Sequence, residues 1–279
     1  MKRINRILAV TSFLILIFNL TVTSAQDLVI LHTNDTHSNI ESLVSGRNKG
    51  YGGVQRRANY IDSVRKMHPD VLLLDAGDYN QGTPYYTLFR GEVEVKLNNA
   101  MGYDVISLGN HEFDNGVQEL AERLKKAEYT TVCANYNFKN TPLEGLVKPY
   151  TIINKGGKKI GILGLLLDLD GYVNRKNREN LIFRKPVETA NKIARILRQR
   201  EKCDLVIALT HIGFDADNER QLSDQTLAKY SKNIDIIIGG HSHTFLEKPV
   251  VIKNRHGKGV IVNQAGTAGV FVGRLDINF

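Results

Sequence analysis

Five short apolar runs in this sequence end directly in polar side chains of the kind that bind metal ions, and this feature constrains the fold more than any other. Ligands of open-sheet α/β proteins bind just outside the carboxyl ends of the strands. The run ends therefore predict one crevice in which their polar side chains meet. The segments are LVILHTNDTH (28–37), VLLLDAGD (71–78), VISLGNHEFD (105–114), LVIALTH (205–211) and IDIIIGGHSH (234–243). The side chains expected in the crevice are Asp35, His37, Asp78, Asn110, His111, His211, His241 and His243.

The expected crevice combines carboxylate, amide and imidazole groups and contains no thiolate. Such a set of donors suits hard or borderline divalent ions rather than a structural zinc site built on cysteine. The pattern therefore predicts metal-assisted hydrolysis.

The first 25 residues have the pattern of a secretory signal peptide. Three cations precede a mostly apolar stretch over residues 7–22, and small residues end the segment at Ala25. The alternative is an uncleaved membrane anchor, but polar residues interrupt the stretch, which falls short of the about 20 apolar residues that span a bilayer. We therefore expect cleavage before Gln26, a secreted or periplasmic protein, and no membrane span in the mature chain.

Without residues 1–25, 254 of the 279 residues remain, which is enough for one large α/β domain over residues 26–279. Loss of the three N-terminal cations lowers the formal charge from +8 to +5, a modest excess spread along the chain. We interpret this excess as a solvated surface rather than a stable nucleic-acid interface, although it favours the approach of anionic substrates. Cys133 and Cys203 lie at the edges of strand-like runs, so buried free thiols are at least as much expected as a disulfide.

Apolar runs of four to seven residues alternate with helix-length segments, which predicts an α/β chain with a largely parallel core sheet. Hairpin signals such as Asn154-Lys155-Gly156-Gly157 predict antiparallel strands later in the chain. These elements fit two sheets packed together with helices outside. The expected strands span 28–33, 71–75, 105–108, 130–134, 150–153, 159–167, 205–210, 234–238, 250–253, 260–264 and 269–278. The expected helices span 53–67, 83–101 with a break near Gly91, 116–128, 186–202 and 219–231.

Two motifs supply carboxylates. Asp35 and His37 are two positions apart, so in extended chain their side chains point to the same side and can hold one ion. Asp78 follows Gly77, and its two oxygens can bridge two ions about 3.5–4 Å apart. An Asp-x-His pair is often incidental, and an Asp after Gly often only forms a turn. The position directly after an apolar run is what favours the ligand roles.

The segment Gly109–Asp114 is the most informative single motif. Asn110 offers an amide oxygen to a metal ion, whereas the adjacent His111 is better placed to meet the substrate as a proton donor or charge stabiliser. Asp114 can accept a hydrogen bond from the other ring nitrogen and keep His111 oriented. The alternative is that Asp114 caps the helix expected from Gly116.

Histidines end the last two runs. His211 ends one of them, and His241 and His243 end the other, so that two imidazoles share one side of an extended segment and can reach two neighbouring ions. The three other histidines are expected to have no chemical role; they are His32 in a strand and His68 and His256 in loops.

The complete motif series resembles the calcineurin-like metallophosphoesterase superfamily. The series is Asp35-x-His37, Gly77-Asp78, Gly109-Asn110-His111-Glu112, His211 and Gly240-His241-Ser242-His243. Longer strings resemble the 5′-nucleotidase family within it: HTNDTHSNIE, GDYNQGTPYYTLFRGE and LGNHEFDNG. The resemblance runs from about residue 27 to the end of the sequence.

The resemblance implies the calcineurin-like metallophosphoesterase fold, a four-layer α/β/β/α sandwich, with two divalent metal ions such as Mn, Zn, Co or Fe. One ion is implied to bind Asp35, His37, Asp78 and His243, and the other Asp78, Asn110, His211 and His241. The implied mechanism is attack on phosphorus by a hydroxide that bridges the ions. His111, oriented by Asp114, is implied to stabilise charge or donate a proton to the leaving oxygen.

The implied activity is that of an exported phosphohydrolase in nucleotide catabolism, which releases phosphate from nucleoside 5′-monophosphates. Full-length family members carry a C-terminal domain that grips the nucleotide, and this sequence ends at Phe279, just beyond the metallophosphoesterase domain. A separately encoded C-terminal-domain partner is one expectation, and weak base selection is another. The alternatives are a phosphodiesterase for cyclic nucleotides or nucleotide sugars, a broad phosphatase, or a metal-binding half-protein that acts only with such a partner.

Overall fold

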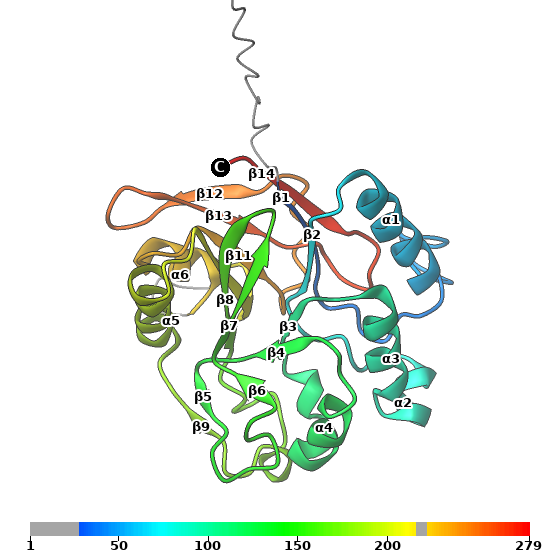
Figure 1. Cartoon of the computed structure of the whole chain (residues 1–279). Helices are drawn as coiled ribbons and strands as arrows, with labels where there is room; N and C mark the ends of the chain where they lie inside the picture. The colour runs from blue at the N-terminus through cyan, green and yellow to red at the C-terminus, as the bar shows by residue number, and fades with distance from the viewer. Residues whose placement is uncertain (1–27, 216–221) are drawn as a thin grey trace, which may run out of the picture.

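Two six-stranded sheets form the centre of the protein (Figure 1). The computed structural model describes residues 28–215 and 222–279, so the predicted signal peptide lies outside the described residues. One sheet has the strand order β14-β1-β2-β3-β4-β6 and the other the order β12-β13-β11-β10-β8-β7, while β5 and β9 form a separate pair. The strands are β1 (Leu28–Thr33), β2 (Val71–Asp75), β3 (Val105–Ser107), β4 (Thr130–Val132), β5 (Tyr136–Asn137), β6 (Val147–Lys148), β7 (Tyr150–Lys155), β8 (Lys158–Leu166), β9 (Ile182–Phe183), β10 (Leu205–His211), β11 (Ile236–Gly239), β12 (Val250–Lys253), β13 (Gly259–Asn263) and β14 (Gly273–Ile277).

Both sheets have parallel centres, with an antiparallel strand at one edge of the first sheet and at both edges of the second. In the first sheet, β1, β2, β3, β4 and β6 run parallel and β14 pairs antiparallel with β1. In the second sheet, β8, β10, β11 and β13 run parallel, with β7 and β12 antiparallel at the edges. The predicted mixture of parallel units and hairpins is confirmed.

Alternating side chains of the strands build two kinds of core, and these define the layers. Leu28 and Ile30 of β1 belong to a core shared with Ile207 of the second sheet, so the two sheets pack face to face. Val29 and Leu31 point the other way, into a core shared with the helices of the first sheet. This period of two is what a strand buried on both faces requires.

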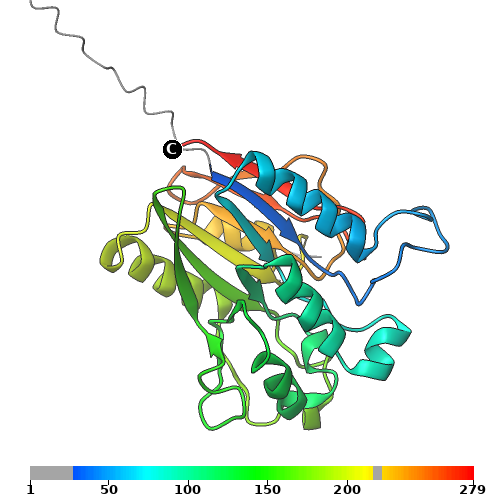
Figure 2. The same cartoon turned by 45° about the vertical axis from the view of Figure 1, so that its right-hand side comes forward.

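Helices cover the outer face of each sheet. Figure 1 shows α1 and α3 on one side of the molecule and α5 and α6 on the other, and Figure 2 shows α1 lying along β1 and β14. The order helix, sheet, sheet, helix confirms the predicted four-layer sandwich. The helices are α1 (Val54–Met67), α2 (Pro84–Phe89), α3 (Glu92–Met101), α4 (Gly116–Leu124), α5 (Pro186–Arg195) and α6 (Asp224–Tyr230), with short 3-10 turns at His111–Phe113 and Arg175–Asn177 and a π-helical turn at Ile196–Arg200.

Most predicted elements are present, with shifted ends. The break expected near Gly91 in the helix over 83–101 is confirmed: α2 and α3 are separate helices, because Arg90 and Gly91 have left-handed φ values of 51° and 88°. The last expected strand begins at Gly273 rather than at 269. Of the helix expected over 219–231, residues 219–221 lie outside the described residues, and α6 begins at Asp224. The two-residue strands β5, β6 and β9 were not predicted, since two residues carry no periodic pattern.

Cys133 and Cys203 are both free and buried, as one of the two expectations had it. Within the described part of the chain, no helix has the length and apolar character needed to cross a membrane.

Candidate metal centre

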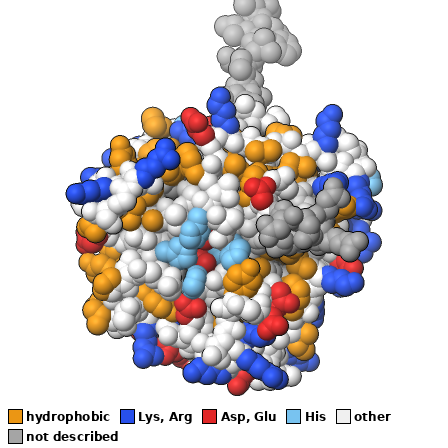
Figure 3. All heavy atoms as spheres, turned by 180° about the vertical axis from the view of Figure 1, so that it is seen from behind, with side chains coloured by type: hydrophobic (Ala, Val, Ile, Leu, Met, Phe, Trp, Pro, Cys, Tyr) orange, Lys and Arg blue, Asp and Glu red, His pale blue; other side chains and the backbone are white. Residues whose placement is uncertain are grey.

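The predicted site residues lie at or just after the carboxyl ends of five strands, and these ends lie on the same side of the two packed sheets. β1, β2 and β3 are parallel neighbours in the first sheet, and β10 and β11 are parallel neighbours in the second. The loops after them therefore meet although they are as much as about 200 residues apart in sequence. Figure 3 shows the result on the surface, where histidine side chains gather in the middle of one face with acidic atoms between them.

The ligand-bearing loops are tight turns rather than extended chain. Asp35 and His37 have φ values of 49° and 45°, and His241 and His243 have values of 80° and 53°. The expectation that each pair lies on extended backbone is therefore wrong. Left-handed backbone costs about 1–3 kcal/mol for such residues and persists only where the surroundings enforce it.

Hydrogen bonds between the loops enforce these turns. The Asp35 amide donates to the Gly77 carbonyl at 2.9 Å and the His37 amide to the Asp78 carbonyl at 3.0 Å. The His241 amide donates to both carboxylate oxygens of Asp35, at 3.1 and 3.0 Å, and thereby joins the two sheets. The ligand geometry is thus held by backbone groups of neighbouring loops.

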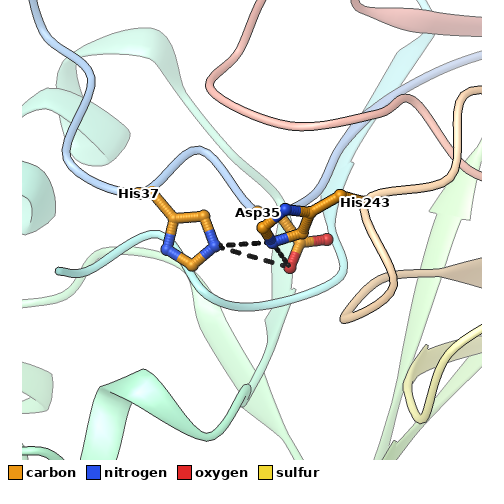
Figure 4. Close-up of side chains that lie close together, drawn as sticks. All are labelled: Asp35, His37 and His243. Atoms are coloured by element: carbon orange, nitrogen blue, oxygen red, sulfur yellow. Dashed lines mark hydrogen bonds and ion pairs between the residues drawn. The ribbon is translucent and has the colours of Figure 1, made fainter. Parts of the chain in front are cut away.

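Asp35, His37 and His243 form the first cluster (Figure 4). The Nε2 atoms of the two histidines are 2.9 Å apart, and Asp35 Oδ1 lies 3.5 Å from His243 Nε2 and 3.8 Å from His37 Nε2. Two donor atoms, each about 2.0–2.2 Å from a shared ion, lie about 3 Å apart at tetrahedral or octahedral angles. The His37 Nδ1 atom is 3.2 Å from the Asn80 carbonyl, which can only accept, so Nδ1 carries the proton and Nε2 presents a lone pair.

Asp78, His211 and His241 form a second cluster. His211 Nδ1 donates to the Ala76 carbonyl at 2.8 Å, which leaves its buried Nε2 facing Asp78 Oδ2 at 3.0 Å. Nε2 and the carboxylate are thus directed at the same place, as ligands of one cation would be. His241 Nδ1 lies 3.1 Å from the Asn110 amide oxygen, which brings the fourth predicted ligand to the same place.

The charges at the site also call for cations. Asp35 and Asp78 are both buried, and burial raises the pKa of Asp35 to about 6. Burial raises the pKa of Asp78 too, but the neighbouring His211 more than offsets this and holds it well below its usual range. Burial lowers the pKa of His211, and the Asp78 and Asp35 carboxylates outweigh that effect and raise it to about 10, so His211 carries a proton when no cation is bound. A divalent cation would replace that proton, because buried carboxylates and imidazoles suit such ions.

Asp78 lies between the clusters. Its carboxylate belongs to the cluster with His211 and His241 and to a third cluster with His37 and His111, in each of which the donor atoms lie within 4.8 Å of one another. Its Oδ1 atom also accepts the backbone amide of His111 at 2.8 Å. This placement is what a carboxylate shared by two ions requires.

His111 stands beside the clusters with its predicted partner. Its Nδ1 is 2.8 Å from Asp114 Oδ2, and both side chains are partly exposed. Burial lowers the pKa of His111, and the bond to Asp114 together with the Asp78 charge more than offsets this, so the net shift is upward. The Asp114 carboxylate is engaged with His111, while the residue before α4 is Asn115, whose side chain makes no capping bond. The capping alternative is therefore not what the structure contains.

Glu112 has a structural role that the sequence did not reveal. Its buried carboxylate accepts the backbone amides of Asp78 at 2.9 Å, Asn80 at 3.2 Å and Gly109 at 2.6 Å, so it ties the loop after β2 to the loop after β3. One hint of this role was present in the sequence, because Glu112 lies among candidate ligands and substrate-facing residues. The role itself could not be predicted, because the partners of Glu112 are backbone amides, which a sequence motif does not specify.

The chain is similar to known phosphoesterases in sequence and in fold. A family model described as calcineurin-like phosphoesterase matches residues 28–245. A snake venom 5′-nucleotidase from Gloydius brevicauda is 38% identical over 275 residues, covering 91% of this chain and 45% of that protein. The 5′-nucleotidase of Bos taurus is 33% identical over 276 residues, covering 91% of this chain and 46% of the relative.

Solved structures agree with these matches. The 5′-nucleotidase precursor from Thermus thermophilus is similar to this chain with a TM-score of 0.81 and 34% identity, covering 91% of this chain and 51% of the other. The NAD nucleotidase of Haemophilus influenzae gives a TM-score of 0.79 at 29% identity, covering 91% and 53%.

The chain spans about half the length of the curated 5′-nucleotidases described above. The matched residues 28–245 nevertheless include all seven predicted ligands together with His111 and Asp114. The fold, the clustered ligands and the family match lead to one conclusion: this chain belongs to the calcineurin-like phosphoesterase family.

Proposed function

We propose that the protein is an exported phosphohydrolase that uses two divalent cations to hydrolyse nucleoside 5′-monophosphates to nucleoside and phosphate. The observation that carries this proposal is the pair of ligand clusters meeting at Asp78, with His111 and Asp114 beside them. The substrate class rests on the similarity to 5′-nucleotidases. Export rests on the signal-peptide pattern of residues 1–25.

The residues present would hold the cations in two sets that share Asp78. Asp35, His37 and His243 complete the first set, and Asn110, His211 and His241 complete the second. Bound cations of this kind lower the pKa of water and neutralise charge on phosphoryl oxygens. Oxygen and nitrogen ligands accept Mn, Zn, Co or Fe, and elemental analysis of the purified protein would identify the metal.

His111 acts on the substrate through its Nε2 atom. Asp114 accepts a hydrogen bond from Nδ1–H of His111, which fixes the ring and favours the protonated form, so that Nε2–H is available as a donor. A donor in that position stabilises a phosphoryl oxygen or protonates the leaving oxygen of the nucleoside. Asp114 is thus the orienting partner of His111.

The test is phosphate release by purified residues 26–279 with Mn²⁺ or Zn²⁺, compared with the same protein in EDTA. AMP turnover that depends on metal and is abolished by His111→Ala supports the proposal. Asp78→Asn is expected to be among the most damaging changes, and near-normal activity of that variant would refute the shared-ligand assignment. Mass spectrometry of exported protein that begins at Gln26 would test cleavage of the signal peptide.

A second candidate is a phosphodiesterase or broader phosphatase with the same centre. The observation that favours it is the similarity to a Bacillus subtilis protein named as a trifunctional nucleotide phosphoesterase, 33% identical over 285 residues, covering 91% of this chain and 18% of that protein. The similarity to an NAD nucleotidase points the same way. Comparison of p-nitrophenyl phosphate with bis-p-nitrophenyl phosphate separates monoesterase from diesterase activity.

A third candidate is a metal-binding half-protein that acts only with a separately encoded C-terminal-domain protein. It is motivated by the match to about half of each 5′-nucleotidase described above. Turnover by the single chain would exclude a docking-only role. Activity that appears only after the partner domain is added would establish it.

A further inference from the structure

An exposed tyrosine stands directly beside the ligand histidines. The ring of Tyr172 lies edge-to-face against the ring of His241, with 5.0 Å between the ring centroids, and 57% of the residue is exposed. Among the described residues, the other aromatic contacts of the ligand imidazoles are all with histidines. Tyr172 is therefore the one aromatic surface in contact with these described ligands that is not itself a ligand or a proton donor.

The segment that carries Tyr172 also contacts the side of the site where the leaving group departs. Asn177, five residues on, donates its amide to the backbone carbonyl of Asp114 at 2.6 Å, and Asp114 holds His111. His111 faces the leaving oxygen when it acts as the proton donor, one of the two roles that the proposed function gives it. The group attached to that oxygen therefore emerges next to the segment between β8 and β9.

This segment is held in place before any substrate binds. The amides of Tyr172 and Val173 donate to the Leu169 carbonyl at 3.2 and 3.0 Å, and the side chains of Leu169 and Val173 are buried. The Leu169 amide donates in turn to the Tyr136 hydroxyl at 2.8 Å. A ring on an anchored segment loses little conformational freedom on binding, as a stacking surface requires.

We propose that Tyr172 is a specificity-determining residue, whose exposed ring stacks against the nucleobase of the bound nucleotide. The inference rests on the proposed function and deepens it, because it names the aromatic base as the recognised part of the leaving group. An aromatic side chain stacks on any base, so the residue selects for a base without selecting among bases. Phosphoesters that lack an aromatic group gain nothing from it.

The test compares AMP with ribose 5-phosphate in the metal-loaded wild type and in Tyr172→Phe, Tyr172→Leu and Tyr172→Ala. We expect the Phe variant to resemble wild type. Loss of the ring in the Leu and Ala variants should raise KM for AMP about tenfold, within the range for one base–aromatic stack, and leave KM for ribose 5-phosphate and kcat unchanged. The Leu variant keeps an apolar contact with His241. Tyr51→Ala, which removes another exposed aromatic side chain, is the matched control.

Equal losses for the two substrates would overturn the inference, because they would mean that the ring only supports His241. Unchanged KM for AMP in the Ala variant would overturn it as well. Calorimetric titration with adenosine tests the stack without turnover: weaker binding in the Ala and Leu variants supports the inference, and equal binding refutes it. If the wild type turns over neither substrate, the proposed function fails while the adenosine titration still decides the role of Tyr172.

Discussion

Replacing Glu112 with glutamine tests whether one buried carboxylate holds the loop after β2, which carries Asp78, against the loop after β3, which carries Asn110. The carboxylate accepts three backbone amides, two at Oε2 from Asp78 and Gly109 and one at Oε1 from Asn80. Glutamine has nearly the same shape and one acceptor oxygen. Its carbonyl can keep the two bonds at the Oε2 position, but its NH₂ group then faces the Asn80 amide, donor against donor.

The magnitude follows from these contacts. A hydrogen bond to a charged group contributes about 1.5–3 kcal/mol, and a buried donor left without a partner costs about 1–3 kcal/mol. Burial and the Asp78 carboxylate raise the pKa of Glu112 to about 8, so at a pH above this value the substitution also removes a charge from a buried position. That removal offsets part of the loss. We therefore expect Glu112→Gln to lower the free energy of unfolding by about 2 kcal/mol.

The same change should weaken metal binding, because Glu112 fixes the loop of Asp78 relative to the loop of Gly109. We expect the affinity for Mn²⁺ to fall about tenfold, in the range seen when groups that support metal ligands are removed. Urea denaturation in EDTA measures the first effect and chelator competition the second. Glu122→Gln is the control, since Glu122 is on the surface beside Lys125 and Gln118, and it should change stability by less than about 0.5 kcal/mol. A Glu112→Gln protein as stable as this control, with unchanged metal affinity, would refute the reasoning.

Three further substitutions have definite expected outcomes. Gly109→Ala should lower kcat at least about tenfold by displacing a catalytic-site carboxylate, because its methyl group would lie 2.2 Å from Asp78 Oδ1; wild-type phosphate release would contradict this. Burial lowers the pKa of His32 to about 4, so the unfolded chain binds the extra proton between pH 6.5 and 4 and stability falls as the pH falls through that window, by up to about 3 kcal/mol. Urea denaturation at about pH 7 and about pH 4.5 should show a smaller pH dependence for His32→Asn than for wild type, and equal dependence would exclude His32 as the cause. Asp224→Ala should cost about 2–4 kcal/mol of unfolding free energy, because it leaves the buried amide of Gln264 without its 2.8 Å partner; a midpoint in urea equal to wild type would argue against that bond.

Local pattern was enough to predict the elements that lead into the site. The strands over 28–33 and 71–75 match β1 and β2, since both are continuous apolar runs bounded by polar residues. The bond between His111 and Asp114 was also predictable, because the two residues are three positions apart. Patterns of this kind depend only on residues that are close in sequence, so they can be recognised before the structure is known.

Short and strained elements were beyond that kind of prediction. β5 and β9 have two residues each and exist because Tyr136 and Phe183 meet across the fold. The left-handed turns at Asp35 and His241 are likewise set by hydrogen bonds from other loops. Asp and His adopt such backbone more often than most other residues, but it remains uncommon, so residue type does not predict where these turns form.

The sequence therefore specified which residues are candidate ligands, and the tertiary structure specified how those residues are arranged around the site. Residue types and their positions after apolar runs were sufficient to name seven candidate ligands and the chemistry expected of them. That Asp78 lies between the two clusters depends on two sheets packed face to face. That Glu112 ties two loops together and that Tyr172 lies against His241 depend on the order of strands within each sheet. The physical reason is that contacts between residues distant in sequence are set by the pairing and packing of complete sheets, and no local periodicity encodes which side chains from different strand ends will touch.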